Sequence, residues 1–186
     1  MGSLTERQKA IVIGCLLGDG AMRCKDNALL EINHSFKQMA YVDWKYQQLK
    51  NITVTPPKKR FGNKGRIAYR FTTRSLPELT KIYRRFYRGH IKVIPKSLKI
   101  TDLSLAIWFM DDGCKSHRAA YFNTQKFSKP EQAMLIKLLR KQHGLEASIN
   151  KDKIYRRLRV AVGSIERLKR LIGPHILPGL TYKLPS

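Results

Sequence analysis

Two aspartates of this chain, Asp19 and Asp112, each follow an apolar stretch and each precede a glycine. The apolar stretches occupy residues 12–17 and 105–110. A carboxylate at the C-terminal end of a helix faces the negative end of the helix dipole, which is unfavourable unless a cation offsets it. Metal ions bound by such carboxylates can activate water, neutralise the charge that builds on a phosphodiester and stabilise the leaving oxygen. Their hard oxygens favour Mg²⁺ or Mn²⁺.

Each aspartate is followed at nearly the same distance by a lysine in similar surroundings. Lys92, in Lys-Val-Ile-Pro, lies 73 positions after Asp19, and Lys183, in Tyr-Lys-Leu-Pro, lies 71 positions after Asp112. Aspartate and glycine after a helix usually mark only a turn. The repetition of acid and lysine together favours a functional pair over two turns. Other residues correspond at similar offsets: Asn33 with Asn123, and Phe36 with Phe127.

The elements that must position these residues follow one order in both halves. Thr5 and Gln8 predict a capping box at the start of a helix that runs to about residue 18. Periodicity then predicts a strand at 28–33, a helix at 38–49, a hairpin of 58–61 with 66–73, and a helix at 76–87. The second half predicts a helix at 101–111, a strand at 119–123, a helix at 130–143, a strand at 147–150, a turn at 151–152, a strand at 154–162 and a helix at 164–172.

These elements predict an α+β fold built from two related αββαββα-like halves, residues 1–96 and 97–186, joined without a flexible linker. If the two apolar helices pack side by side about a pseudo-two-fold axis, Asp19 and Asp112 emerge next to each other. Asp111 points elsewhere and contributes through its backbone. Trp44 and Trp108 lie among apolar helix residues and are predicted to belong to the core.

Strand alternation predicts two sheets that each have one basic face. In the first half Arg66, Ala68, Arg70 and Thr72 share a face opposite Ile67, Tyr69 and Phe71; in the second, Tyr155, Arg157 and Arg159 lie opposite Ile154, Leu158 and Val160. A two-stranded ribbon fits the DNA major groove, where arginine pairs with guanine. Lys58, Lys59, Arg60 and Lys64 are better placed to hold phosphate. Each of these side chains could equally be a solvated surface charge.

The composition agrees with a polyanionic partner. Lysine and arginine outnumber aspartate and glutamate by 37 to 13, which gives a formal net charge of +24 and a pI near 10.3. The sequence has no long apolar run and no signal-peptide pattern, which argues against membrane insertion and secretion. The odd count of cysteines predicts reduced thiols in an intracellular protein. Cys114 and His117 lack a second ligand pair at zinc spacing, and the histidines lack the spacing of an H-N-H nuclease.

Four motifs together resemble one family. They are residues 17–20, residues 105–113, Asn123-Thr124-Gln125 and Tyr182-Lys183-Leu184-Pro185. With them the chain resembles the LAGLIDADG homing endonucleases in their single-chain, two-motif form, similar to the omega-type intron endonucleases of yeast mitochondria. The resemblance runs from about residue 5 to the C-terminus.

The resemblance implies a site and a substrate. Asp19 and Asp112 would bind two or three Mg²⁺ ions with backbone carbonyls near Gly18 and Asp111, with Mn²⁺ as a substitute and Ca²⁺ supporting binding without cleavage. The other catalytic residues implied are Lys92 and Lys183, which would polarise solvent, and Gln125, which would position water. The two sheets would form a saddle on a long asymmetric double-stranded DNA site. Cleavage would leave short 3′ overhangs, and the protein would act as a monomer in bacterial cytoplasm or an organelle.

Two other functions fit the same scaffold. The first is an intron maturase that binds intron RNA and assists splicing, and the second is a DNA-binding regulator without catalysis. Both aspartates and both lysines are present, which favours the endonuclease over either alternative.

Overall fold

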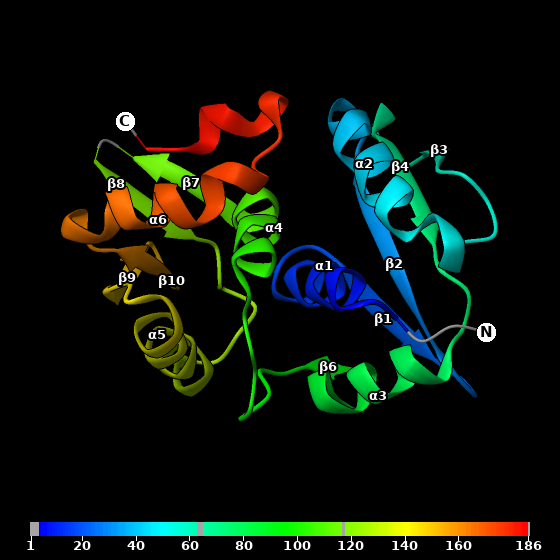
Figure 1. The fold of residues 1–186 in the computed structure, drawn as a ribbon, viewed down its shortest axis with the longest axis horizontal. Helices are drawn as coiled ribbons and strands as arrows, with labels where there is room; N and C mark the ends of the chain where they lie inside the picture. The colour runs from blue at the N-terminus through cyan, green and yellow to red at the C-terminus, as the bar shows by residue number, and fades with distance from the viewer. Residues whose placement is uncertain (1–3, 63–64, 117, 186) are drawn as a thin grey trace. The chain divides into compact units, whose positions relative to one another are not determined.

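The computed structural model describes residues 4–62, 65–116 and 118–185, and these form two compact units (Figure 1). The first unit comprises residues 1–84 and the second residues 85–186. The sequence predicted a division after residue 96. With the division inside the third helix, Lys92 belongs to the second unit.

The first unit combines one antiparallel sheet with three helices. In chain order its elements are α1 (Glu6–Leu17), β1 (Ala21–Cys24), β2 (Ala28–Ser35), a 3₁₀ turn (Phe36–Gln38), α2 (Met39–Leu49), a 3₁₀ turn (Lys50–Ile52), β3 (Lys58–Phe61), β4 (Ile67–Thr72) and α3 (Pro77–Phe86). The last two residues of α3 belong to the second unit. The strands lie in the order β1-β2-β4-β3. Helix α2 packs on β2 and β4.

The second unit repeats that order. A short hairpin of β5 (Tyr87–Arg88) and β6 (Ile91–Lys92) precedes α4 (Asp102–Asp112), β7 (Gly113–Ser116), β8 (Ala119–Phe122), α5 (Lys129–His143), β9 (Ala147–Asp152), β10 (Tyr155–Val160), α6 (Ile165–Ile172) and 3₁₀ turns at Val162–Ser164, Gly173–His175 and Pro178–Lys183. The sheet order β7-β8-β10-β9 matches that of the first unit position by position. The predicted α+β class and duplicated αββαββα order are therefore confirmed.

Both motif helices begin at a threonine cap and are apolar on nearly every side. Thr5 and Gln8 form the predicted capping box, with both reciprocal hydrogen bonds at 3.1 Å. Thr101 Oγ1 accepts a hydrogen bond from the Ser104 N–H at the start of α4. Every residue of α4 from Leu103 to Asp111 is buried, including Trp108, which confirms that tryptophan as core. Trp44 is only half-buried.

Two predictions about the last hairpin are wrong. Strand β9 continues through Asp152, whose register partner is Tyr155, so the turn lies at Lys153 and Ile154 and not at residues 151–152. Lys153 has a positive φ of 55°, a conformation that a two-residue hairpin turn requires. Ile154 is consequently 81% exposed at the turn instead of packing with Leu158 and Val160.

No helix within residues 4–62, 65–116 and 118–185 combines the length and the apolar character needed to cross a membrane.

Candidate functional site

Each motif aspartate sits on a chain reversal that only glycine permits. The Gly20 N–H donates to Cys15 O at 2.7 Å, so the chain folds back against the end of α1. A Cβ on Gly20 would lie 2.8 Å from Cys15 Cβ, and one on Gly113 would lie 2.3 Å from Phe109 O. Both distances are shorter than van der Waals contact. A side chain at either glycine would therefore clash with the end of the preceding helix.

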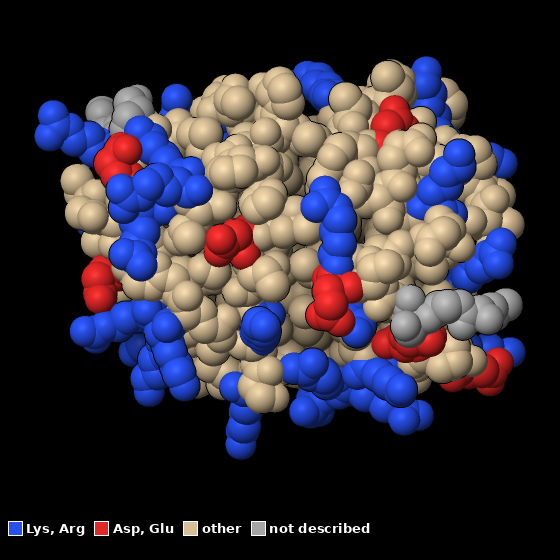
Figure 2. Space-filling model, viewed as in Figure 1, with Lys and Arg blue, Asp and Glu red and all other residues tan. Residues whose placement is uncertain are grey.

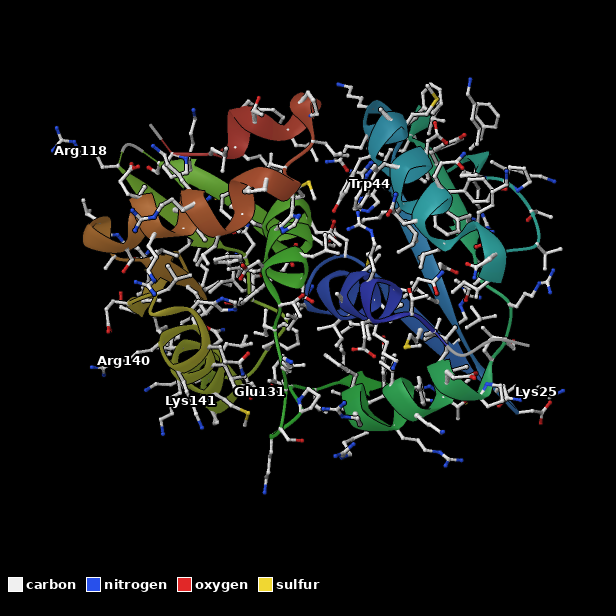
Figure 3. The ribbon with its side chains drawn as sticks, viewed as in Figure 1. Lys25, Trp44, Arg118, Glu131, Arg140 and Lys141 are labelled. Carbon is white, nitrogen blue, oxygen red and sulfur yellow. The ribbon has the colours of Figure 1, made fainter. Side chains whose placement is uncertain are left out.

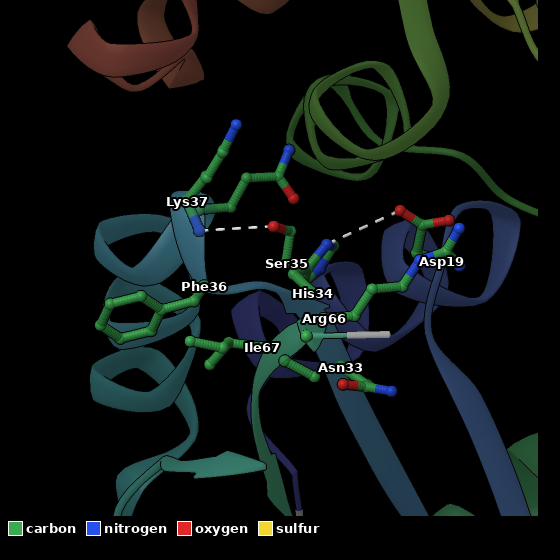
Figure 4. A pocket seen from close by; sticks show the side chains of 11 residues that line it. Asp19, Asn33, His34, Ser35, Phe36, Lys37, Arg66 and Ile67 are labelled. Carbon is green, nitrogen blue, oxygen red and sulfur yellow. Dashed lines mark hydrogen bonds and ion pairs between the residues drawn. The ribbon is translucent and has the colours of Figure 1, made fainter. Parts of the chain in front are cut away.

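Asp19 stands at the rim of an open pocket of about 800 Å³ in the first unit (Figure 4). Its side chain is 46% exposed, and Oδ2 lies 3.6 Å from Nδ1 of the buried His34. The pocket is also lined by Asn33, Ser35 and Arg66. Asp19 thus presents a solvent-accessible carboxylate with an imidazole behind it. Gly18, the residue before it, caps α1, and its N–H donates to Gly14 O at 3.0 Å.

Asp112 occupies the corresponding place in the second unit with different partners. Its side chain is only 13% exposed, and Oδ2 lies 2.9 Å from Lys126 Nζ. The Asn123 N–H donates to Asp112 O at 3.0 Å, which ties the end of α4 to the segment after β8. Gln125 is exposed in that segment, with Nε2 3.5 Å from Asn123 Oδ1.

The C-terminal 3₁₀ turn brings Lys183 to the end of α4. Lys183 Nζ donates to Asp111 O at 3.1 Å and to Met110 O. These carbonyls carry the negative end of the helix dipole, which a cation stabilises. A carbonyl oxygen has two lone pairs, so Asp111 O can still accept a second ligand. Lys92 lies on β6, where it pairs with Tyr87 and is half-buried in the second unit.

The first sheet has the predicted basic outer face. The residues around one open depression on it are Arg23, Glu31, Asn33, Arg60, Gly62, Arg66, Ala68, Arg70 and Thr72. The opposite face packs on α2, where the Tyr69 hydroxyl donates to Asp43 at 3.0 Å and Phe71 meets the Tyr46 ring edge to face. Burial raises the pKa of Tyr69, and the hydrogen bond and charge of Asp43 raise it further. The alternation predicted along β4 is therefore confirmed.

Strand β3 divides its basic residues between two faces. Lys58 pairs with Arg70 and Arg60 pairs with Ala68, so both lie on the outer face of the sheet. Lys59 pairs with Tyr69 on the other face, and its Nζ lies 4.2 Å above the Phe36 ring. Lys64, predicted to hold phosphate, lies outside the described residues.

The second sheet offers a smaller basic face. Arg157 stacks on the Tyr121 ring at 4.3 Å, and its Nη1 lies 3.8 Å from Cys114 Sγ. Arg159 pairs with Tyr121 across the β8–β10 ladder, so it shares this face. Leu158 and Val160 are fully buried on the other side. The three cysteines are free thiols, and His117, weighed with Cys114 as half of a zinc site, lies outside the described residues.

Residues 9–168 match the family model described as the LAGLIDADG DNA endonuclease family. The chain belongs to this family. It is 31% identical to cytochrome b mRNA maturase bI2 of Saccharomyces cerevisiae over 99% of the chain, which spans 48% of that relative. It is 30% identical to a probable intron-encoded endonuclease 1 of Wickerhamomyces canadensis, with 98% of the chain and 85% of the relative covered.

The fold agrees with that of a solved member of the family. The homing endonuclease I-WcaI, in a structure bound to its DNA recognition sequence, matches with a TM-score of 0.91 at 28% identity, over 99% of this chain and 88% of that one. The chain spans about half the length of the yeast maturase, and most of the length of I-WcaI.

Several residues of the candidate site were not identified from the sequence. Arg23 and Glu31 form an ion pair on the outer face of the first sheet, and Arg23 lies on β1, a strand whose range the sequence did not indicate. Lys126 follows the Asn-Thr-Gln motif directly, and its contact with Asp112 depends on the turn after β8. The alternation of buried and exposed residues along β2 could have found Glu31 and Asn33, because it points them both outward.

Positive charge covers much more of the molecule than the two sheet faces. On the face shown in Figure 2, lysine and arginine side chains gather in groups, mainly toward its edges, and the acidic side chains are scattered. Arg140 and Lys141 project from α5, and Lys25 projects from the β1–β2 turn (Figure 3). Such a surface suits a polyanion.

Proposed function

We propose that this LAGLIDADG protein is a site-specific endonuclease that cuts both strands of a long, asymmetric double-stranded DNA target with divalent metal ions. The observation that supports this most is the similarity, over 99% of the chain, to a homing endonuclease bound to its DNA recognition sequence. The basic outer faces of the two sheets supply the phosphate and base contacts. Because the halves differ in sequence, a single copy suits a non-palindromic site.

The residues present fit a divalent ion. In each unit a carboxylate ends an apolar helix, and in the second unit a lysine ammonium already lies against the carbonyl oxygens of that end. Oxygen-rich positions of this kind suit hard cations such as Mg²⁺. Asp19 and Asp112 would hold the ions, with the carbonyls of Gly18 and Asp111 in support. When bound, the ions supply an activated water and offset the charge on the scissile phosphate.

The remaining residues position solvent and DNA. Lys183, held by two carbonyls beside Asp112, orients water toward one phosphate, and Lys92 serves the other strand in the same way. Gln125 aligns a water through its amide. The outer-face arginines, Arg66 and Arg70 in the first sheet with Arg157 and Arg159 in the second, read bases in the major groove. Lys58 and Arg60 hold the backbone nearby.

A selection experiment tests this function. A library of randomised double-stranded DNA is incubated with the purified protein in Mg²⁺, and cleaved molecules are recovered and sequenced. We expect one long asymmetric consensus, which also binds without being cut when Ca²⁺ replaces Mg²⁺. The Asp19→Asn/Asp112→Asn protein serves as the control and should bind the consensus without cutting it. Recovery of no common sequence, or equal cutting by the control, would contradict the proposal.

An RNA maturase is the second candidate, because the chain is 31% identical to a cytochrome b mRNA maturase. A maturase would bind folded intron RNA and stimulate its splicing without any need for the two carboxylates. Splicing assays with the intron RNA that encodes the protein, run with wild type and with Asp19→Asn/Asp112→Asn, separate the activities. Stimulation by both proteins, with no cutting of DNA by wild type, would favour the maturase.

A further inference from the structure

A lysine of the first unit is completely enclosed. Lys45 lies on α2 with an exposed fraction of 0%, in a chain whose other charges lie mostly at the surface. Its Nζ lies 3.0 Å from Nε2 of His34, which is itself 6% exposed, and 4.2 Å from the centre of the Tyr41 ring. Burial of a charge is unfavourable unless it is paired and hydrogen-bonded. Packing alone therefore does not explain a lysine at this buried position.

The contacts of His34 point toward the proposed metal site. An ammonium has three donors and no acceptor, so a charged Lys45 pairs with a His34 ring that accepts at Nε2 and carries its proton on Nδ1. The Nδ1–H of this neutral ring faces the Asp19 carboxylate, with Nδ1 3.6 Å from Oδ2, slightly beyond the distance of a direct hydrogen bond (Figure 4). Lys45, His34 and Asp19 therefore form a line that begins in the core and ends at the exposed carboxylate.

The second unit shows that the fold does not require this pair. A shift of 90 positions places His34 on Thr124 and Lys45 on Leu135, just as it places Asn33 on Asn123 and Leu49 on Leu139. Thr124, Leu135, Leu49 and Leu139 are all fully buried, so the matched positions share the same core location. A threonine and a leucine occupy those core positions in the second unit. The lysine and histidine are thus peculiar to the half that contains Asp19.

We propose that Lys45 and His34 are a buried positioning pair that holds the Asp19 carboxylate, an inference that rests on the proposed endonuclease function. Lys45 fixes the tautomer of His34, and the Nδ1–H of His34 directs Oδ2 of Asp19. In the second unit Lys126 contacts Asp112 directly from a partly exposed position. The Asp19 carboxylate is therefore held by His34 and Lys45, and the Asp112 carboxylate by Lys126. Cutting of the two DNA strands depends on these different residues.

The test exchanges the pair for the residues of the second unit. The variant His34→Thr/Lys45→Leu is compared with wild type on a consensus target carrying a different label on each strand. Outer-shell partners of metal ligands typically contribute 10- to 100-fold to activity or metal affinity. We expect single-turnover cutting of one strand to slow by about 10-fold or more, with a raised Mg²⁺ requirement, while the other strand slows less. DNA binding in Ca²⁺ should be unchanged, because the pair lies on the buried side of the sheet and not on the outer face proposed to contact DNA.

Further variants keep the outcome interpretable. Lys45→Met preserves length and removes only the ammonium, so it serves if the double variant does not fold, and it should show the same strand bias. His34→Gln retains a side-chain donor, so it should cut the affected strand faster than the variant His34→Thr/Lys45→Leu does. Thr124→Val, at the matched position of the second unit, should leave the ratio of the strand rates unchanged.

The failures are distinguishable. If wild type cuts and the His34 and Lys45 variants keep both strand rates, the positioning role is wrong. Loss of both strand rates in proportion to lost DNA binding would also overturn it, because that pattern reports general damage to the fold. If wild type itself does not cut DNA, the proposed function fails instead.

Discussion

The side chain of Lys183 binds the backbone of Asp111: the lysine Nζ donates to the Asp111 carbonyl oxygen at 3.1 Å, one residue before Asp112. The second carbonyl that Lys183 binds belongs to Met110. A residue 72 positions after Asp111 in the sequence is thereby anchored to the end of the motif helix. The paired spacing of acid and lysine has a direct structural counterpart in this unit.

Replacement of Lys183 by methionine should slow DNA cutting more than it weakens DNA binding. Positioned groups that assist proton transfer typically contribute about 10²- to 10⁴-fold to rate, so we expect a loss of at least about 10²-fold in single-turnover cutting. The affinity for DNA in Ca²⁺, where no cutting is expected, measures the effect on binding. Lys141→Met, which removes an exposed lysine from α5, is the matched control for charge. Equal losses of cutting and binding would argue against a catalytic role.

The glycine after each motif aspartate should resist substitution. In Gly113→Ala the new Cβ would meet Phe109 O at 2.3 Å, so the turn at the end of α4 must shift. We expect a loss of about 1–3 kcal/mol in the free energy of unfolding, as overpacking typically produces. Gly163→Ala is the control, since no atom lies within 4 Å of its added Cβ. Urea unfolding measures both, and an equal effect would refute the steric explanation.

Affinity for DNA should fall steeply with salt. Neutralisation of about 6 to 10 phosphates predicts a loss of about 10³- to 10⁵-fold in affinity between about 50 and 200 mM salt. Removal of a phosphate contact, as in Lys58→Gln or Arg60→Gln, should reduce the slope of log affinity against log salt by about 1. A slope that neither substitution changes would place DNA elsewhere on the protein.

The stability of the second unit should depend on pH through His143. Burial lowers the pKa of His143 below its ordinary value of 6.5, while the charge of Asp102, 3.3 Å away, opposes the shift. Below the ordinary pKa the unfolded chain therefore binds a proton more readily than the folded chain. The contribution of His143 is fully present above about pH 6.5 and declines as the pH falls further.

The glutamine variant isolates this effect. His143→Gln should lower stability at about pH 7.5 yet flatten the decline of the unfolding free energy between about pH 6.5 and 5. Urea titrations across that range give the two slopes. Identical slopes for wild type and variant would contradict the pKa assignment.

The duplicated order of elements was predictable because it depends on local signals. The capping box at Thr5 and Gln8 and the alternation along β4 each act within one element, and both predictions are confirmed. The turn of the last hairpin was not. Its position depends on whether Lys153 adopts a positive φ, which no residue type there indicates.

The side chains that contact the two motif aspartates could not be predicted from the sequence. Lys126 reaches Asp112 only because the segment after β8 folds back against α4, and Lys45 reaches His34 because α2 lies across the sheet. Such contacts depend on tertiary packing and leave no periodic pattern. A lysine on a helix usually predicts solvent exposure, which hid the buried Lys45.

The central claim is that Asp19 and Asp112 together carry the cutting chemistry, and strand-resolved cleavage by Asp19→Asn and Asp112→Asn in Mg²⁺ tests it most directly. The account predicts that each single substitution abolishes double-strand cutting while binding of the consensus in Ca²⁺ persists. Unchanged cleavage of both strands by either variant would contradict it.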